Sequence, residues 1–314
     1  MIVTLTLNPS VDRTVEVEAL DRGSVVRALG VHVDAGGKGI NVSRALAAHG
    51  VKTRAVVTTG GAEGEHLVAL LEADGIDILP VPVPGATRSN IAVVEPDGTT
   101  TKFNEPGAPL DAGQVAACVN AVTSSVSGAD WVVASGSLPP GVEPGFYADL
   151  ARTLRASGAL IAVDTSGQAL SAVLDAEPAL VKPNRDELAE STGIALHTIG
   201  DVVDAARQLH SRGARAVLAS LGRDGAVLVD DDGAVFGAAP EVVPVSSVGA
   251  GDAMLAGFLS AGGRGPDALA AALSWGAAAA SLPGSKMPGP DDVIHRNLRL
   301  VQPPDRTREL SPAP

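Results

Sequence analysis

The chain has 314 residues, of which 45% are hydrophobic and only 2% aromatic, with a formal net charge of −13 and a pI near 4.8. This acidity excludes nucleic acid or an anionic membrane as the main partner, because both attract positively charged surfaces. The scarcity of aromatic residues predicts a core of Ala, Val and Leu, as in buried parallel strands covered by helices. Cys118 is the only cysteine, so an internal disulfide and a cysteine-based metal site are excluded, and we interpret it as a core residue.

The chain opens with an alternating strand pattern at residues 2–7 and shows neither a leader pattern nor a run of ~18 apolar residues. We therefore expect a cytoplasmic protein.

Strand and helix patterns alternate along most of the chain. Further strands are predicted at 53–59, 76–83, 131–135, 160–164, 180–181 and 216–220, with a hairpin at 226–229 and 234–238. Helices are predicted from the glycines at 36–39 to about 50, at 64–74, 114–126, 145–156, 168–174, 201–212 and 266–281, and directly after residue 252. This order predicts an α/β fold with a doubly wound, mostly parallel sheet flanked by helices.

Two segments interrupt that alternation. Residues 14–18 alternate like a half-exposed antiparallel strand, and residues 89–95 and 99–103 flank an Asp97-Gly98 turn typical of a hairpin. We expect about 12–35 and 87–105 to form a small separate β structure inserted in one domain that spans 1–300. The proline-rich, charged residues 303–314 are predicted to be a disordered tail.

Polar or glycine-rich clusters follow four predicted strands, at 8–13, 135–141, 182–187 and 220–225. Because the carboxyl ends of parallel strands share one edge of a sheet, we expect these clusters to converge on a ligand site.

The stretch from Val248 to Met254 combines two glycines with an acid at a predicted helix start. Gly249 and Gly251 let the backbone approach a phosphate, where the helix dipole and unpaired N–H groups attract anions. Asp252 is a poor phosphate ligand but a suitable general base for an attacking hydroxyl. The alternative is a glycine turn in which Asp252 only caps the helix.

A second anion site is predicted at Gly36-Gly37-Lys38-Gly39, where a lysine adds its charge to a helix N-terminus. The alternative is a solvated lysine in a flexible loop. Arg27 and Arg88 flank the two insertions and could close on the same anion, or remain surface arginines.

Asn184 and Glu187 stand three residues apart at a helix start, so both could address the water shell of a magnesium nucleotide, or form a capping box instead. The turn from Ser220 to Gly225 could lie against a nucleotide or simply open a hairpin. Asp12, after a strand and a turn, could accept hydrogen bonds from two sugar hydroxyls or cap the turn.

Several of these clusters occur together in one family. Residues 36–45 and 248–258 resemble the two signatures of the ribokinase-like PfkB sugar kinases, and the resemblance extends over about residues 1–300. Residues 8–12, 135–141 and 182–188 further resemble the branch that phosphorylates sugars already carrying one phosphate.

The resemblance implies a nucleotide-binding α/β body with a small β lid formed by the two insertions, and a homodimer that pairs through the lids. It implies ATP as co-substrate with Mg²⁺, and a phosphosugar as acceptor. Fructose 1-phosphate, giving fructose 1,6-bisphosphate, is the preferred acceptor because Lys38 stands where the form acting on fructose 6-phosphate tends to carry glycine. Tagatose 6-phosphate and fructose 6-phosphate are the alternatives, and a non-catalytic sugar-phosphate sensor is a remoter one.

The resemblance also implies roles for individual residues. Asp252 would take the proton from the sugar hydroxyl, and the backbone of Gly249, Ala250 and Gly251 would stabilise the transferred phosphoryl group. The expected phosphosugar contacts are Asp12, Arg27, Gly37, Lys38, Asn41, Arg88 and Ser137. The expected nucleotide contacts are Lys182, Asn184, Ser220, Gly222, Gly225 and Ser247. Asn184 and Glu187 would organise Mg²⁺ through water.

Overall fold

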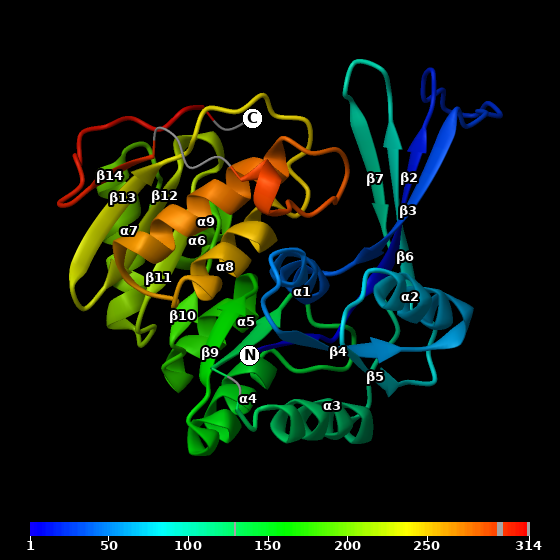
Figure 1. The fold of residues 1–314 in the computed structure, drawn as a ribbon, viewed down its shortest axis with the longest axis horizontal. Coiled ribbons are helices and arrows are strands. Elements are labelled where there is room, and N and C mark those ends of the chain that lie inside the picture. The colour runs from blue at the N-terminus through cyan, green and yellow to red at the C-terminus, as the bar shows by residue number, and fades with distance from the viewer. Residues whose placement is uncertain (129, 294–297, 313–314) are drawn as a thin grey trace.

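The computed structural model describes residues 1–128, 130–293 and 298–312 (Figure 1). Over these residues, ten strands form one sheet in the order β14-β13-β12-β11-β10-β9-β8-β1-β4-β5. The parallel part consists of β1 (Ile2–Thr6), β4 (Thr53–Thr59), β5 (Ile78–Pro82), β8 (Trp131–Ser135), β9 (Leu160–Asp164), β10 (Leu180–Val181) and β11 (Val217–Ser220). The antiparallel edge consists of β12 (Ala226–Asp230), β13 (Gly233–Ala238) and β14 (Arg299–Val301).

Helices cover both faces of this sheet, which confirms the predicted doubly wound α/β fold. One face packs against α1 (Lys38–Ala48), α2 (Gly61–Ala73), α8 (Ala250–Ser260) and α9 (Gly265–Ala280). The other packs against α3 (Ala112–Ser125), α4 (Phe146–Leu154), α5 (Gly167–Val173), α6 (Arg185–Thr192) and α7 (Ile199–Ser211). Cys118 in α3 is fully buried in this second layer, as predicted.

The two insertions form a separate four-stranded sheet in the order β3-β2-β6-β7, and Figure 1 shows it standing out from the body as a lid. Its strands are β2 (Ser10–Glu16), β3 (Gly30–Gly36), β6 (Arg88–Val94) and β7 (Thr100–Asn104). The predicted antiparallel pairing holds for β2–β3 and for the β6–β7 hairpin. The two insertions join through β2 and β6, which are parallel because both run outward from the body.

The prediction of a disordered tail is wrong for residues 305–311, which pack along the N-terminal end of α7. The N–H groups of Ile199 and Gly200 donate to the carbonyls of Arg308 and Arg306 at 2.9 and 3.0 Å, and the side chain of Leu310 packs against the core. Composition missed this because the segment is held by backbone hydrogen bonds and by side-chain hydrogen bonds to residues far away in the sequence, which composition does not reveal. Residues 313 and 314 of the predicted tail lie outside the described residues.

Within the described ranges, no helix is long and apolar enough to cross a membrane.

Candidate active site

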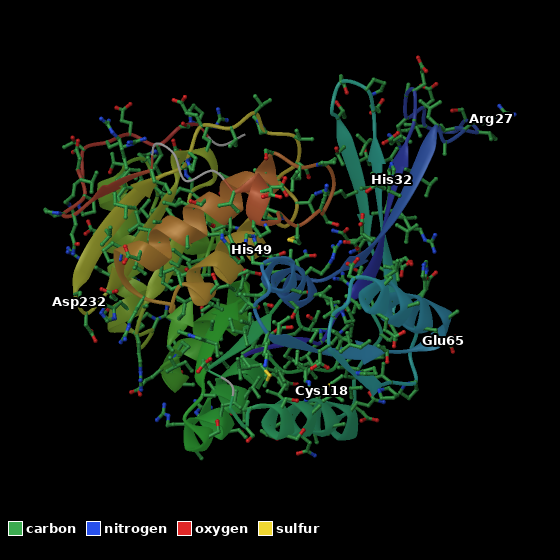
Figure 2. The ribbon with its side chains drawn as sticks, viewed as in Figure 1. Arg27, His32, His49, Glu65, Cys118 and Asp232 are labelled. Atoms are coloured by element: carbon green, nitrogen blue, oxygen red, sulfur yellow. The ribbon has the colours of Figure 1, made fainter. Side chains whose placement is uncertain are left out.

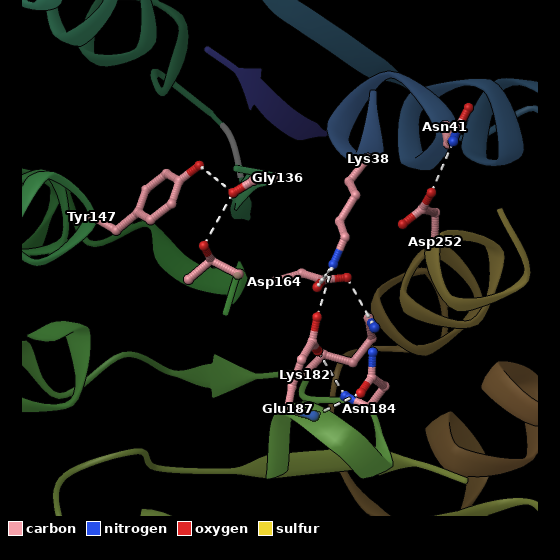
Figure 3. Close-up of polar contacts among 10 residues, drawn as sticks. Lys38, Asn41, Gly136, Tyr147, Asp164, Lys182, Asn184, Glu187 and Asp252 are labelled. Carbon is pink, nitrogen blue, oxygen red and sulfur yellow. Dashed lines mark hydrogen bonds and ion pairs between the residues drawn. The ribbon is translucent and has the colours of Figure 1, made fainter. Parts of the chain in front are cut away.

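The polar clusters predicted to converge do meet along one edge of the sheet. Strands β1, β8, β9, β10 and β11 are consecutive neighbours, and their carboxyl ends carry Asn8, Ser135, Asp164, Lys182 and Ser220. The N-termini of α1 and α8 lie over the same edge (Figure 3). Gly136 joins two of these ends, since its N–H donates to the carbonyl of Asp164 at 2.9 Å.

Helix α8 begins at the glycine corner and carries Asp252 in its first turn. Gly249 has φ 75°, and α8 has no side-chain cap. The left-handed conformation favours glycine here, whereas the Met287 methyl group, 2.5 Å from where a Cβ would stand, ends a flexible side chain that can move aside. Asp252 is 7% exposed, and its Oδ2 accepts a hydrogen bond from Asn41 Nδ2 at 2.8 Å.

The environment of Asp252 makes its carboxylate a better base than an ordinary aspartate. Burial, helped by the negative charge of Asp164, raises the pKa of Asp252 to about 6, while the Asn41 hydrogen bond and the two nearby lysines oppose the shift. A carboxyl with this pKa is mostly ionised near neutral pH and holds a proton more tightly than a solvated aspartate does. This combination suits general base catalysis.

Asp164 holds two lysines that come from distant parts of the chain. Its Oδ1 lies 2.6 Å from Lys38 Nζ, and its Oδ2 lies 2.9 Å from Lys182 Nζ (Figure 3). Asp164 and Lys182 are both buried, and Lys182 Nζ lies 3.4 Å from where a Cβ on Gly251 would stand. The ammonium of Lys182 therefore faces the glycine corner.

Burial acts against the charges of Asp164 and Lys38, but attraction to neighbouring opposite charges prevails in both. The pKa of Asp164 is lowered by Lys182 and Lys38 in spite of its burial. The pKa of Lys38 is raised because Asp164 and Glu187 together outweigh desolvation. Asp164 and Lys38 are therefore both charged at neutral pH, beside the corner at Gly249–Gly251.

Sequence reasoning missed Asp164 as a functional residue. Its only signal is an acid as the last residue of an otherwise apolar strand, directly after Val163. The sequence alone does not show that Lys38 and Lys182 meet at that point.

Asn184 and Glu187 form a capping box at the start of α6, which the sequence offered as the alternative to a magnesium-nucleotide site. Glu187 N donates to Asn184 Oδ1 at 2.8 Å, and Asn184 N donates to Glu187 Oε2 at 2.9 Å. The other oxygen of Glu187, Oε1, lies 3.6 Å from Lys38 Nζ, toward the shared site. Among the described residues there is no group of three or more His, Cys, Asp or Glu side chains arranged to hold a metal by themselves.

The turn after β11 has a structural reason for its second glycine. Gly225 has φ 110°, and a side chain there would collide with the carbonyl oxygen of Gly237 across the β12–β13 hairpin. Ser220 nevertheless lies beside Asn184, since its N–H donates to the Pro183 carbonyl at 3.0 Å. Gly222 and Ser247 are exposed to solvent.

Lid and body meet at Asp12 and Arg88. Asp12 Oδ1 accepts hydrogen bonds from Ser10 Oγ at 2.6 Å and Asn90 Nδ2 at 2.9 Å. Arg88 donates through Nε and Nη2 to the carbonyl of Asn8 at 3.2 and 3.1 Å, and burial lowers its pKa against the pull of Asp12.

Asn8 and Asn90 are polar residues of this junction that the sequence analysis did not single out as ligands. Asn8 Nδ2 also donates to Ser137 Oγ at 3.2 Å, so the exposed Ser137 lies beside the junction. Gly37, with φ 129°, is the N-cap of α1, and a Cβ built on it would stand 3.5 Å from Pro9 Cα, next to Asn8 in the chain.

Arg27 is not brought to this site within one chain. It is exposed in the loop between β2 and β3, and Figure 2 shows it at the outer end of the lid, pointing away from the body. The loop extends outward because the β2–β3 hairpin ends there.

The fold and the site together define a class of protein, a small-molecule kinase with a ribokinase-like α/β body and a β lid. In agreement, the model of the pfkB family of carbohydrate kinases matches residues 5–287. The chain belongs to the pfkB carbohydrate kinase family and is an ATP-dependent sugar kinase by membership.

Curated relatives and solved structures agree with this family. The 1-phosphofructokinase of Haloferax volcanii is 39% identical over 98% of this chain and 100% of its own length. The 1-phosphofructokinase of Rhodobacter capsulatus is 42% identical over 88% and 90% of the two chains. Phosphofructokinase-2 from Escherichia coli, in complex with substrates and products, superposes with a TM-score of 0.87 at 35% identity, covering 93% of this chain and 96% of that one.

Proposed function

We propose that this chain transfers the terminal phosphoryl group of ATP to fructose 1-phosphate, releasing fructose 1,6-bisphosphate and ADP. The observation that carries the chemistry is the buried carboxylate of Asp252, held by Asn41 at the uncapped N-terminus of α8. The choice of acceptor is supported by the curated relatives, which are 1-phosphofructokinases.

In this proposal Asp252 takes the proton from the attacking sugar hydroxyl. The hydroxyl oxygen forms a bond to the terminal phosphorus, the bond from that phosphorus to the bridging oxygen breaks, and its electron pair leaves with ADP. The backbone N–H groups of Gly249, Ala250 and Gly251 stabilise the charge on the transferred group, with the α8 dipole adding to their effect.

The positions of Lys38 and Lys182 suggest that both act on the transferred phosphoryl group. The sequence assigned Lys38 to the phosphate already present on the sugar. Its contacts with Asp164 and Glu187 instead bring its ammonium beside the corner that faces ATP. We therefore propose that Lys38 and Lys182 neutralise charge that develops during transfer.

The residues at this edge fit a divalent cation. Lys38 and Lys182 contribute two positive charges against three negative ones from Asp164, Glu187 and Asp252, a net charge of −1. Glu187 Oε1 takes no part in the capping box, so it would hold Mg²⁺ through water, and Asn184 Oδ1 keeps a lone pair for a second water. Bound Mg²⁺ would supply charge neutralisation at the phosphate oxygens.

We assign the phosphosugar to the space between lid and body. Asp12 would accept hydrogen bonds from sugar hydroxyls there, with Arg88, Ser137 and the backbone of Gly37 around it. Two buried amide oxygens, Oδ1 of Asn41 and Oδ1 of Asn90, have no hydrogen-bond partner within the described part of the chain. Because buried acceptors without partners are costly, hydroxyl groups of a bound sugar would stabilise both.

We assign the nucleotide to the other side of Asp252, along the ends of β10 and β11. Lys182 and Asn184 would face its phosphates, and the turn of Ser220, Gly222 and Gly225 would line the rest, with Ser247 opposite. Support comes from the hydrogen-bonded contact between the two strand ends.

The test is ADP formation with fructose 1-phosphate, fructose 6-phosphate, tagatose 6-phosphate and their unphosphorylated sugars. We expect fructose 1-phosphate to have the highest kcat/KM. A higher value for another phosphosugar would overturn the acceptor. Binding without turnover of any of them would make the chain a sugar-phosphate sensor.

We also propose that the chain forms a homodimer through its lid. By the strand register, Val31, Ile91 and Phe103 lie on one face of the lid sheet, and all three are exposed. Leu29, directly before β3, is exposed as well. Contiguous exposed apolar residues on a sheet favour pairing with a like surface.

The dimer is tested by sedimentation of the purified chain and of Phe103→Asp. We expect wild-type protein to sediment at twice the chain mass of 31.4 kDa and Phe103→Asp to dissociate. Thr100→Asp on the opposite lid face is the matched control and should stay dimeric. A monomeric wild type would contradict the proposal.

A further inference from the structure

The carboxylate of Asp224 points to a role for the C-terminal segment. Asp224 ends the turn Gly222–Asp224 that we assign to the nucleotide, and its side chain is buried. Its hydrogen-bond donors in the described structure are both from Ser311, 87 residues away. Ser311 N donates to Oδ2 at 2.9 Å, and Ser311 Oγ donates to Oδ1 at 2.8 Å.

The same serine reaches the second loop that we assign to the nucleotide. Its carbonyl accepts from Arg185 Nη1 at 2.6 Å, while Arg185 Nη2 donates to the Leu196 carbonyl at 2.7 Å. Arg185 is the first residue of α6, directly after Asn184. All three polar groups of Ser311 are therefore hydrogen-bonded. Its N–H and hydroxyl bind Asp224 in one nucleotide loop, and its carbonyl binds Arg185 beside the other.

The preceding residues anchor this contact at the start of α7. The carbonyls of Arg306 and Arg308 accept from the first N–H groups of that helix, and Leu310 N donates to the His197 carbonyl at 2.8 Å. A side chain at Gly200 would meet the Arg306 carbonyl oxygen at 2.7 Å, so glycine permits the close approach.

We propose that residues 305–311 form a strap that positions the nucleotide loops, with Ser311 as its positioning residue. This inference deepens the proposed function and rests on its nucleotide assignment. Without the strap, the buried carboxylate of Asp224 would lose both donors, and because an unpaired buried carboxylate is costly the turn would move to expose it to water. The site for ATP would then be less preorganised, whereas the phosphosugar side between Asp12 and Arg88 would be unaffected.

The experiment compares two changes in the full-length enzyme. Ser311→Pro removes both donors to Asp224 and leaves the contacts of Arg306 and Arg308. It should raise the KM for ATP and the Kd for ADP by roughly tenfold, as expected for loss of a hydrogen bond to a charged group. The KM for the phosphosugar should stay within about twofold, as expected for a site that the contact does not reach. Arg306→Ala is the matched control, because it removes only an exposed ion pair with Asp204 from the same strap. It should leave the KM for ATP, the Kd for ADP and the KM for the phosphosugar unchanged.

A chain that stops at Gln302 and a pair of variants complete the test. Truncation should weaken ADP binding at least as much as Ser311→Pro does. The double variant Asp224→Ala/Ser311→Pro should bind ADP no more weakly than Ser311→Pro alone, because each change breaks the same contact between Asp224 and Ser311. Unchanged ADP affinity in Ser311→Pro and in the truncated chain would overturn the strap, and so would an equal rise in both KM values with a lower Tm. If the wild type binds ADP but does not phosphorylate fructose 1-phosphate, only the proposed acceptor is rejected. The ADP affinities of the variants then still test whether the strap positions the nucleotide loops.

Discussion

The N-termini of α1 and α8 are built alike and carry opposite charges. Each follows a glycine with positive φ, Gly37 at 129° and Gly249 at 75°, and neither has a side-chain cap. Lys38 at the start of α1 meets two carboxylates, so its pKa rises and its charge is fixed. Asp252 at the start of α8 is held by a neutral amide, and burial raises its pKa to about 6. Two similar helix starts therefore have different roles: the start of α1 supplies the permanent positive charge of Lys38, and the start of α8 supplies Asp252 as a proton acceptor.

The largest effect should come from removing the proton acceptor. Asp252→Asn keeps the size of the side chain but cannot take the hydroxyl proton, so kcat should fall by about 10²- to 10⁴-fold, the usual contribution of a general base. Steady-state kinetics on the purified variant checks this. Near-normal turnover would remove Asp252 from the mechanism.

The same variant should remain folded and bind ADP. Because the folded pKa of about 6 exceeds the ordinary 3.8, the folded state favours the protonated carboxyl, and stability from this group falls as pH rises between those values. A neutral Asn should therefore leave the Tm at pH 8 unchanged or higher. A lower Tm together with lost ADP binding would mean that the kinetic loss reflects misfolding.

The next effect concerns the acid that holds the lysine corner in place. Asp164→Leu leaves Lys182 buried without its partner, which should destabilise the fold by about 3 kcal/mol in urea unfolding. Asp149→Leu, which removes an exposed ion pair with Arg152, is the control and should have little effect. Equal, small losses in both variants would show that the lysines do not depend on Asp164.

A smaller effect separates the two assignments of Lys38. If Lys38 acts on the transferred group, Lys38→Met should lower kcat about tenfold or more and change the KM for the phosphosugar little, as for an interaction made mainly in the transition state. If Lys38 instead holds the phosphate already on the sugar, that KM should rise while kcat stays near the wild-type value. Initial rates at varied phosphosugar and saturating ATP distinguish the two.

The sequence was most informative where a function depends on neighbouring residues. The corner from Gly249 to Asp252 is a local arrangement of glycines, helix start and acid, and the structure places it at the edge where the strand ends meet. The strand and helix patterns likewise predicted the body and the lid hairpin. Strand β5 lies at the edge of the sheet, where its two prolines can be accommodated.

The sequence was least informative where a function depends on distant partners. An acid at the end of β9 looks ordinary until Lys38 and Lys182 are seen beside it. The strand β14 was missed because it pairs through backbone hydrogen bonds and has little apolar periodicity. The contacts of residues 305–311 were missed because their backbone and side-chain hydrogen bonds join residues far apart in the sequence. Arg27 was grouped with Arg88 by sequence pattern, yet the hairpin carries it to the far end of the lid.

The pH dependence of kcat/KM for fructose 1-phosphate tests the central claim, that Asp252 is the base. The wild type should lose activity as pH falls through about 6, because Asp252 becomes protonated there. The phosphate of the substrate also titrates near pH 6, at about the same point, so the profile is measured in Asp252→Asn as well. We predict that the residual activity of the variant shows a shallower acid limb with one ionisation fewer. An identical acid limb in both proteins would contradict the assignment of Asp252 as the proton acceptor.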